Sequence, residues 1–318
     1  MNELVQEALA EYEFTDPQLS FIRHNENITY KIDDNDKNYV LRIKKPVEGF
    51  TSDIFGTEIT AYELMEDEMM MIEYARNVIR LALQKPIRNR KGKLVSRLSD
   101  GSPACLLEWV EGEVLNEKTV TSKQAALLGK MAAQLHRGLH GQEYIFKRFS
   151  YTVNLIQPMK EQLDDAAQNG QITKEKTELM KTALHIIESR MLELDAIQGM
   201  KGMLHADLGL SNVIVTETDL IPIDFSLSGY GYYFMDVAMM MSQFKDKKIR
   251  WCIKQGYEQE SNKEVPAPFI DAFFALGVLL YICCQHNRVW KEDWFSETIN
   301  RWCNTIFIPL IKGTEYVL

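Results

Sequence analysis

The sequence predicts an α+β fold with a strand-rich first part and a larger, mainly helical second part. Three short runs rich in β-branched and aromatic residues follow one another at 19–24, 28–33 and 39–43, and polar turn residues separate them. From Ser122 onward, apolar residues recur at helical spacing instead. Because 318 residues exceed what a single hydrophobic core usually serves, we expect these parts to be two domains.

In the first part, polar turns join neighbouring strands into hairpins. Residues 34–37, which read Asp-Asn-Asp-Lys, are a strong turn signal, and Lys91-Gly92 marks the turn of another hairpin. Apolar residues spaced for one helical face predict a helix before the first strand and another after the third. The elements expected beside the three strands are a helix at 2–13, a helix at 54–69, a hairpin within 83–98 and a buried strand at 104–110.

The second part is expected to combine helices with one hairpin. Two short apolar runs, 213–215 and 220–223, flank the polar tetrad Thr-Glu-Thr-Asp, which is typical of a β-hairpin. The expected helices lie at 122–136, 153–168, 174–196, 236–258, 267–286 and 291–311.

Composition is that of an ordinary globular protein, with 46% apolar and 25% charged residues. The net charge of −9 argues against nucleic acids and anionic membranes as partners.

The longest apolar run, 273–284, is too short for a membrane span and predicts a buried helix. The acidic, amphipathic start of the chain is neither a signal nor a transit peptide. Five cysteines without a C-x-x-C motif indicate free thiols rather than a zinc site. We therefore expect a cytoplasmic protein with no membrane or nucleic-acid partner.

The residues that could do chemistry are concentrated between positions 203 and 225. His205 and Asp207 lie in an expected loop, and Asn212 follows Asp207 by five positions. Asp224 ends the second strand of the hairpin, and a hairpin of this length folds it back beside Asn212. Hard oxygen donors grouped in this way suit Mg²⁺, which is usually held by one or two carboxylates together with substrate phosphates.

This H-x-D-x-x-x-x-N pattern, followed by a hairpin and Ile-Asp-Phe, resembles the catalytic and metal-binding loops of protein-kinase-like phosphotransferases. In detail it is more similar to the aminoglycoside phosphotransferase and choline kinase superfamily. Members of that superfamily typically read H-G-D-L-H-x-x-N, then I-D-F or I-D-W, then a D-L-A helix start, which Asp236 supplies here. The chain departs from the pattern with Ala206 in place of glycine and Gly209 in place of the second histidine. Neither change removes a side chain that does chemistry.

The resemblance implies a two-lobed, protein-kinase-like fold. Residues 1–111 would form a small antiparallel β lobe that binds the nucleotide, and residues 112–318 a larger, mainly helical lobe that binds the acceptor. In the catalytic loop, the resemblance implies that Asp207 is the base and that Asn212 and Asp224 hold Mg²⁺. His205 and Asp236 are expected to support the loop, the latter from the start of its helix, where it would also act as an N-cap. A residue of the helix at 122–136, His136, is expected to pack and hydrogen-bond rather than to catalyse.

The resemblance also implies where the nucleotide would bind. Arg42 takes the position of the phosphate-pairing lysine of V-A-I-K strands, with a solvated strand charge as the alternative interpretation. Glu58 is the expected partner that orients Arg42, and Glu63 is its competitor. The adenine would meet backbone groups near Glu108 and Val110.

The predicted function is transfer of the γ-phosphate of ATP, or of GTP, to a hydroxyl group of a small molecule. One alternative is a nucleotide-binding regulator without activity, although all three residues at the transfer step are present. Another is a kinase with a protein acceptor, although the eleven residues between Asp224 and Asp236 leave no room for a long activation loop. A third is a ferredoxin-like or Rossmann domain in which His205 is a core residue and the acids are solvated turn residues. Because the second part is only weakly acidic and rich in tryptophan, we expect a neutral or singly charged alcohol and not a polycationic aminoglycoside.

Overall fold

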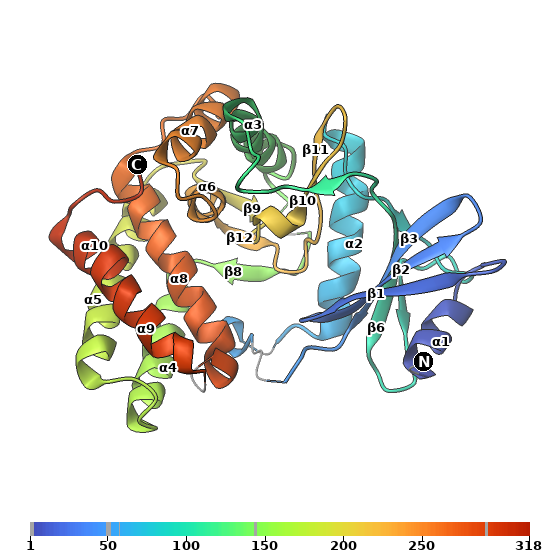
Figure 1. Cartoon of the computed structure of the whole chain (residues 1–318), viewed down its shortest axis with the longest axis horizontal. Coiled ribbons are helices and arrows are strands. Elements are labelled where there is room, and N and C mark those ends of the chain that lie inside the picture. The colour runs from blue at the N-terminus through green and yellow to red at the C-terminus, as the bar shows by residue number, and fades with distance from the viewer. Residues whose placement is uncertain (1–2, 49–51, 57, 143–144, 290–291) are drawn as a thin grey trace.

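The computed structural model describes residues 3–48, 52–56, 58–142, 145–289 and 292–318 and has the two-lobed α+β architecture that the sequence predicts. The small lobe, at the right of Figure 1, is built on one antiparallel sheet, and the large lobe at the left is mainly helical. The elements of the small lobe are α1 (Glu3–Ala10), β1 (Gln18–His24), β2 (Asn27–Asp34), β3 (Lys37–Lys44), the 3-10 turn η1 (Asp53–Phe55), α2 (Ala61–Val78), β4 (Pro86–Ile87), β5 (Val95–Arg97) and β6 (Pro103–Glu108).

Strand alternation divides the small-lobe sheet into two buried faces. The strand order is β1-β2-β3-β6-β4, and β5 pairs with another stretch of β6. Leu41 and Ile43 belong to the core beneath α1, together with Val5. Arg42 and its cross-strand neighbour Cys105 face the opposite side, which α2 covers. Because successive side chains of a strand point to opposite faces, the Arg42 guanidinium points away from the α1 core, towards α2.

The hairpin predicted within 83–98 is wrong in its pairing. Its two strands, β4 and β5, both pair with β6. The side chain of Asn89 accepts hydrogen bonds from the backbone amides of Lys91 and Lys93 (3.0 and 2.9 Å), so it closes the turn. The edge of β6 then supplies the backbone partners of both short strands.

The helix predicted at 54–69 begins later and extends further. Residues 53–55 form the turn η1, which ends at Gly56 with a φ of 82°. Thr60 and Glu63 form a capping box that starts α2 at Ala61, and the helix continues to Val78. The start of α2 is therefore determined by its cap and not by the first apolar residue of the pattern.

The large lobe contains two small sheets and several long helices. Its sheets have the orders β11-β10-β7 and β8-β12-β9. The elements are β7 (Glu113–Val114), α3 (Ser122–Gly138), β8 (Phe149–Tyr151), η2 (Val153–Leu155), α4 (Ile156–Gln168), α5 (Lys174–Asp195), β9 (Lys201–Leu204), η3 (Leu210–Asn212), β10 (Val213–Val215), β11 (Leu220–Pro222), β12 (Gly229–Tyr232), α6 (Tyr233–Ser242), α7 (Lys247–Ser261), α8 (Ala267–Val289), α9 (Asp293–Trp302), the π-helical turn η4 (Cys303–Phe307) and α10 (Ile308–Lys312).

Two predicted helices of the large lobe are interrupted. The segment 236–258 is divided between α6 and α7, because Asp246 caps a new helix by accepting a hydrogen bond from Lys248 N (2.8 Å). The segment 291–311 contains α9 and α10 with a π-helical turn between them. The boundary at 111/112 stays a prediction; it falls between β6, in the small-lobe sheet, and β7, which pairs with β10.

Helices α3 and α7 cross at close range. A Cβ atom on Gly129 would come within 1.9 Å of the carbonyl oxygen of Ile253, and one on Gly256 within 1.9 Å of that of Ala126. This crossing brings His136 of α3 and Tyr257 of α7 together beneath the catalytic loop.

Helix α8 forms the apolar centre of the large lobe. Among the described residues it alone contains a stretch, Ala267–Gln285, apolar and long enough to cross a membrane, and 61% of that stretch is buried in the fold. Length and composition are weak evidence for a span, because a buried core helix meets the same criterion. The packing of α8 against α4, α5 and α6 is that of the buried helix expected at 267–286.

Candidate active site

The loop after β9 is held in place by one buried carboxylate. Asp236 accepts hydrogen bonds from the backbone amides of His205 (2.9 Å) and Ala206 (2.7 Å). Ala206 has a φ of 60°, the left-handed region where glycine is favoured, which explains why glycine is usual at this point of the motif. Asp236 lies in the first turn of α6 and Tyr232 is the N-cap residue, so the predicted capping role of Asp236 is wrong and its role towards the loop is correct.

His136 and Tyr257 hold Asp236 from the other side. The His136 ring is within hydrogen-bonding distance of Asp236 (Nε2 to Oδ2, 2.9 Å) and of the Tyr257 hydroxyl (3.0 Å), and it stacks on Tyr233. Burial raises the pKa of Asp236, but the hydrogen bond and charge of His136 and the charge of His205 outweigh it and hold the pKa below its ordinary value. His136 is the packing and hydrogen-bonding residue that the sequence predicts.

Asp207 lies next to Asn212, as the motif predicts. The Asn212 amide donates to the Asp207 carboxylate (2.7 Å) and to its backbone carbonyl (3.0 Å). Burial, reinforced by the negative charges of Asp224 and Glu26, raises the pKa of Asp207 to about 8, against the hydrogen bond from Asn212 and the charge of Arg23. A carboxylate with a pKa in this range accepts a proton more readily than an ordinary aspartate.

Asp224 is brought to the same end of the hairpin. The backbone amide of Ile223 donates to the carbonyl of Asn212 (2.9 Å), which places Asp224 one residue beyond this pairing. Asp224 has a φ of 62°, a strained conformation of the kind that concentrates at functional sites. Burial raises its pKa, but Arg42 and Arg23 lower it to about 2, so the carboxylate is ionised.

The buried partner of Arg42 is Glu68, and the pairing predicted for Glu58 is wrong. The Arg42 guanidinium donates to both carboxylate oxygens of Glu68, at 2.6 and 3.2 Å. Glu58 is exposed and Glu63 belongs to the capping box of α2, where it also pairs with Lys147. The prediction failed because α2 starts at Ala61, which leaves Glu58 outside the helix, whereas Glu68 lies on the buried helix face that meets the sheet.

A signal for Glu68 was present in the sequence. Glu68 lies on the apolar stripe of α2, among Met65, Met69 and Ile72, which are all buried. A lone acid on an apolar helix face needs a buried cation, because an unpaired buried charge is costly.

Arg148 is a further residue that the sequence did not reveal. Its guanidinium donates to the backbone carbonyls of Phe225 (2.8 Å), Ser226 (2.7 Å) and Ser228 (3.2 Å) in the loop after Asp224, and also to that of Leu64 in α2. One buried arginine thus joins the small lobe to the loop after Asp224.

The predicted adenine-binding backbone is partly engaged within the protein. The amide of Glu108 donates to the carbonyl of Lys85 (2.8 Å), and the carbonyl of Glu108 accepts from the side chain of Gln84 (2.9 Å). A carbonyl oxygen accepts two hydrogen bonds, so Glu108 keeps one acceptor position. Val110 follows after β6 ends.

The donor set at the hairpin end fits Mg²⁺. One buried oxygen of Asp224, Oδ1, has no hydrogen-bond partner in the described part of the chain and lies 3.5 Å from Arg42 Nη2. Asn212 supplies a neutral amide oxygen beside it. No group of three or more His, Cys, Asp or Glu side chains among the described residues is arranged to hold a metal. The pair therefore fits an ion whose other ligands are phosphate and water oxygens.

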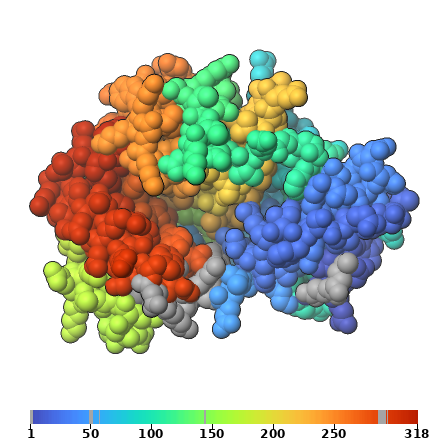
Figure 2. Space-filling model, viewed as in Figure 1, coloured from blue at the N-terminus to red at the C-terminus, as the bar shows by residue number. Residues whose placement is uncertain are grey.

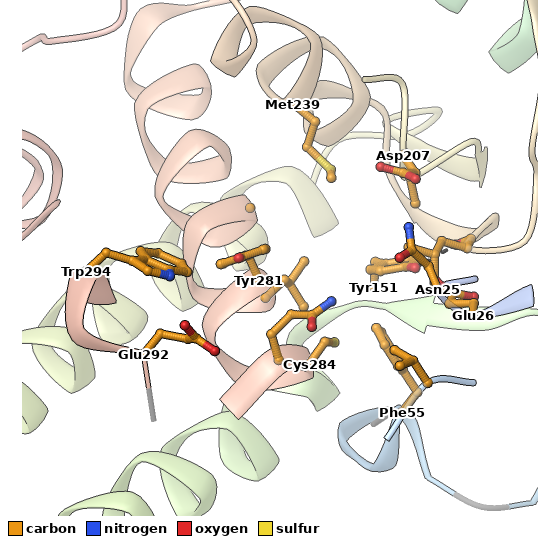
Figure 3. Close-up of a pocket in the computed structure, with 16 residues that line it drawn as sticks. Asn25, Glu26, Phe55, Tyr151, Asp207, Met239, Tyr281, Cys284, Glu292 and Trp294 are labelled. Carbon is orange, nitrogen blue, oxygen red and sulfur yellow. Dashed lines mark hydrogen bonds between the residues drawn. The ribbon is translucent and has the colours of Figure 1, made fainter. Parts of the chain in front are cut away.

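A cavity of about 670 Å³ opens beside Asp207. It lies between the lobes, where the space-filling view shows a hollow between the small lobe in blue and the red C-terminal helices. Figure 3 shows Asp207 near one end of the cavity, Trp294 and Glu292 at the other, and Tyr281 and Cys284 of α8 between them. Small-molecule sites have volumes in this range.

The comparisons with known proteins agree with this geometry. A model of the phosphotransferase enzyme family matches residues 18–260. No curated protein sequence matches the chain significantly. The similar solved structures include a microcompartment-associated aminopropanol kinase (20% identity, TM-score 0.79, covering 99% of each chain). They also include an amicoumacin kinase in complex with AMP-PNP, Ca²⁺ and the compound abbreviated Ami (19% identity, TM-score 0.70, covering 99% of this chain and 94% of that one).

A third similar structure is a spectinomycin phosphotransferase in complex with ADP and spectinomycin, with 14% identity, a TM-score of 0.69, and coverage of 99% of this chain and 98% of that one. These likenesses confirm the predicted kinase-like fold. The family match extends over both lobes and includes the whole catalytic loop and hairpin. The chain belongs to the phosphotransferase enzyme family.

Proposed function

We propose that the protein transfers the γ-phosphoryl group of ATP, or of GTP, to a hydroxyl group of a small molecule. The observation that carries this proposal is the position of Asp207, which lies half-buried beside Asn212 and lines the 670 Å³ cavity. In the reaction, the acceptor oxygen forms a bond to the γ-phosphorus while the bond to the leaving nucleoside diphosphate breaks. The hydroxyl proton passes to the Asp207 carboxylate.

Asn212 and Asp224 would hold Mg²⁺. When bound, the ion neutralises charge on the phosphate oxygens and on the leaving group. Arg42, fixed by Glu68, would bind the α- and β-phosphates, and a planar guanidinium suits this task because it presents several donors and stays charged. The free acceptor position of Glu108 and the amide of Val110 would bind the base. The five free thiols suit the cytoplasmic location that the sequence predicts.

The walls of the cavity favour an acceptor with at most one positive charge. Glu26 is already paired with Lys44 (2.7 Å), and Asp207 is assigned to proton transfer. Glu292 remains at the far end, beside the exposed ring of Trp294 (Figure 3). A single carboxylate next to an aromatic face suits one ammonium group. A buried oxygen of Gln285 that has no hydrogen-bond partner among the described residues can accept a hydrogen bond from that ammonium group or from a hydroxyl. Of the structural relatives, the aminopropanol kinase is named for an acceptor of this kind.

The test is nucleoside diphosphate release with ATP or GTP and a panel of amino alcohols, sugars, nucleosides and aminoglycosides. We expect saturable phosphorylation of a neutral or singly charged alcohol. Glu292→Gln should raise KM for a cationic acceptor only, whereas the matched change Glu297→Gln, at an exposed position of α9, whose N-cap is Glu292, should leave KM unchanged. Efficient phosphorylation of a polycationic aminoglycoside would overturn the acceptor assignment. Phosphate transfer only to a protein would overturn the small-molecule assignment.

A further inference from the structure

An ion pair between the lobes at the catalytic site is made by an arginine that no motif contains. Arg23 Nη2 of β1 lies 2.5 Å from Asp224 Oδ2. Asp224 belongs to the loop after β11, so the ion pair joins the small lobe to the metal-binding end of the hairpin. About a third of the Arg23 side chain is exposed (36%). The side chain is therefore partly exposed and not fixed in the core.

An irregularity in β1 directs Arg23 to this place. Phe21 is paired with Tyr30, but the next pair is Arg23 with Thr29, so Ile22 is an extra residue in the strand. Thr29 is in turn paired with Arg42 on β3. Directly opposite residues in neighbouring strands share one face of a sheet. The bulge thus aligns Arg23 with Arg42 in one row, where a regular strand would have placed Ile22.

The two arginines at this point are balanced by the carboxylates of Asp224 and Glu68, and a metal ion on Asp224 would change that balance. Asp224 faces two guanidinium groups, and Arg42 has a second carboxylate of its own in Glu68. In the described part of the chain, the ion-pair partner of Arg23 is Asp224. If Asp224 binds a metal ion, Arg42 remains neutralised by Glu68, whereas Arg23 loses its counter-charge. The anion that arrives with the metal is the polyphosphate of the nucleotide.

The turn beside Arg23 supplies no glycine-rich phosphate cover. The turn between β1 and β2 reads Asn25-Glu26, and the chain contains no G-x-G-x-x-G sequence. The Glu26 carboxylate of this turn is paired with Lys44 and offers phosphate no donor. A cation at the end of β1 can compensate for both features, since an arginine presents a fork of donors to phosphate oxygens.

We propose that Arg23 is a phosphate-binding residue which pairs with Asp224 in the nucleotide-free protein and transfers to the β- and γ-phosphates when the metal–nucleotide complex binds. This inference rests on the proposed function and deepens it, because it gives this chain a substitute for the glycine-rich loop. A competing role is simple blockade, in which Arg23 only occupies Asp224 and must be displaced. The two roles predict opposite effects of removing the charge.

Calorimetric binding of ADP, with and without Mg²⁺, and of adenosine separates these roles. Arg23→Gln should weaken ADP binding by about ten- to a hundredfold, the value of a charge-assisted hydrogen bond, and leave adenosine binding within about twofold. Arg23→Lys should be intermediate, because lysine keeps the charge without the fork. The matched control is Arg88→Gln, at an exposed arginine of the same lobe that pairs with Glu73.

The possible results are distinguishable. Binding of Mg²⁺–ADP by Arg23→Gln that equals or exceeds that of the wild type would overturn the inference and favour blockade. Equal loss of ADP and adenosine binding would also overturn it, since the arginine would then support the fold of the lobe. A wild-type protein that binds neither ADP nor ATP would overturn the proposed function itself.

Discussion

Arg42 and Glu68 form a bidentate ion pair in which both side chains are almost completely buried, at 6% and 2% exposure. Removing one partner of such a pair leaves an uncompensated buried charge. Glu68→Gln should therefore lower the free energy of unfolding by about 3–5 kcal/mol, measured by urea denaturation. The matched change Glu58→Gln, at the exposed glutamate, should alter it by less than about 0.5 kcal/mol. Equal effects of the two changes would contradict the assignment of Glu68.

Asp207→Asn tests the proton acceptor. The variant keeps the hydrogen-bonding shape of the side chain but has no carboxylate to take the hydroxyl proton. Turnover should fall by about 10²–10⁴-fold, with nucleotide affinity nearly unchanged. Asp219→Asn, in the exposed turn of the hairpin, is the control. Full turnover of Asp207→Asn on the true acceptor would show that another group takes the proton.

Asp224→Ala tests the metal site. It removes the buried oxygen that has no hydrogen-bond partner among the described residues. Binding of Mg²⁺–ADP should weaken far more than binding of metal-free ADP, because only the former uses the carboxylate. Calorimetry with and without Mg²⁺ measures the difference. An equal loss under both conditions would point to a disturbed fold.

Ala206→Gly tests the backbone of the catalytic loop. An L-residue at a φ of 60° is strained by about 1–2 kcal/mol, whereas glycine is not, although glycine loses more entropy on folding. We expect a gain in stability of up to about 1 kcal/mol, seen as a higher melting temperature. Ala196→Gly, at an exposed position with a φ of −75°, should give no gain. A loss of stability in Ala206→Gly would contradict the strain.

Asp271 should make stability depend on pH. Burial raises its pKa from 3.8 to about 6, although the backbone amides of Val317 and Tyr316 donate to it. Between these values the folded protein binds the proton more tightly than the unfolded chain does. This contribution to stability is therefore complete below pH 4 and is lost as the pH rises to 6. The difference in unfolding free energy between wild type and Asp271→Asn, measured across pH 4–7, should change in this window. A constant difference would contradict the prediction.

The sequence predicted the three neighbouring strands of the small lobe, the hairpin at 213–223 and the catalytic loop, because their signals are local. The turn 34–37 and the short apolar runs define neighbouring strands, and the spacing of Asp207 to Asn212 is set within one loop. The match of residues 18–260 to the phosphotransferase enzyme family agrees with the resemblance drawn from these motifs. The assignment of each side chain to its role at the site stays a prediction.

What the sequence did not predict depends on three-dimensional context. Glu58 satisfied a spacing rule, but the capping box starts α2 at Ala61, after position 58. Glu68, inside the helix, is the glutamate that faces the sheet. The role of Arg23 could not be predicted from the sequence, because its position depends on a β-bulge. A bulge changes the sheet face of every residue that follows it in the strand. Arg148 donates to backbone carbonyls. Because every residue has a backbone carbonyl, the amino-acid sequence does not identify these partners.

The contacts of Arg148 determine how the two lobes can move. This residue donates to the carbonyl of Leu64 in α2 and to three further carbonyls in the loop after Asp224, so we expect these segments to act as one hinge. Arg42, Glu68 and Asp224 lie near that hinge and should keep their relative positions when the cleft opens. The widest movement would then occur at the β1–β2 turn. Nucleotide and acceptor would enter there, past Asn25 and Glu26, while Arg42, Glu68 and Asp224 beside the pivot remain assembled.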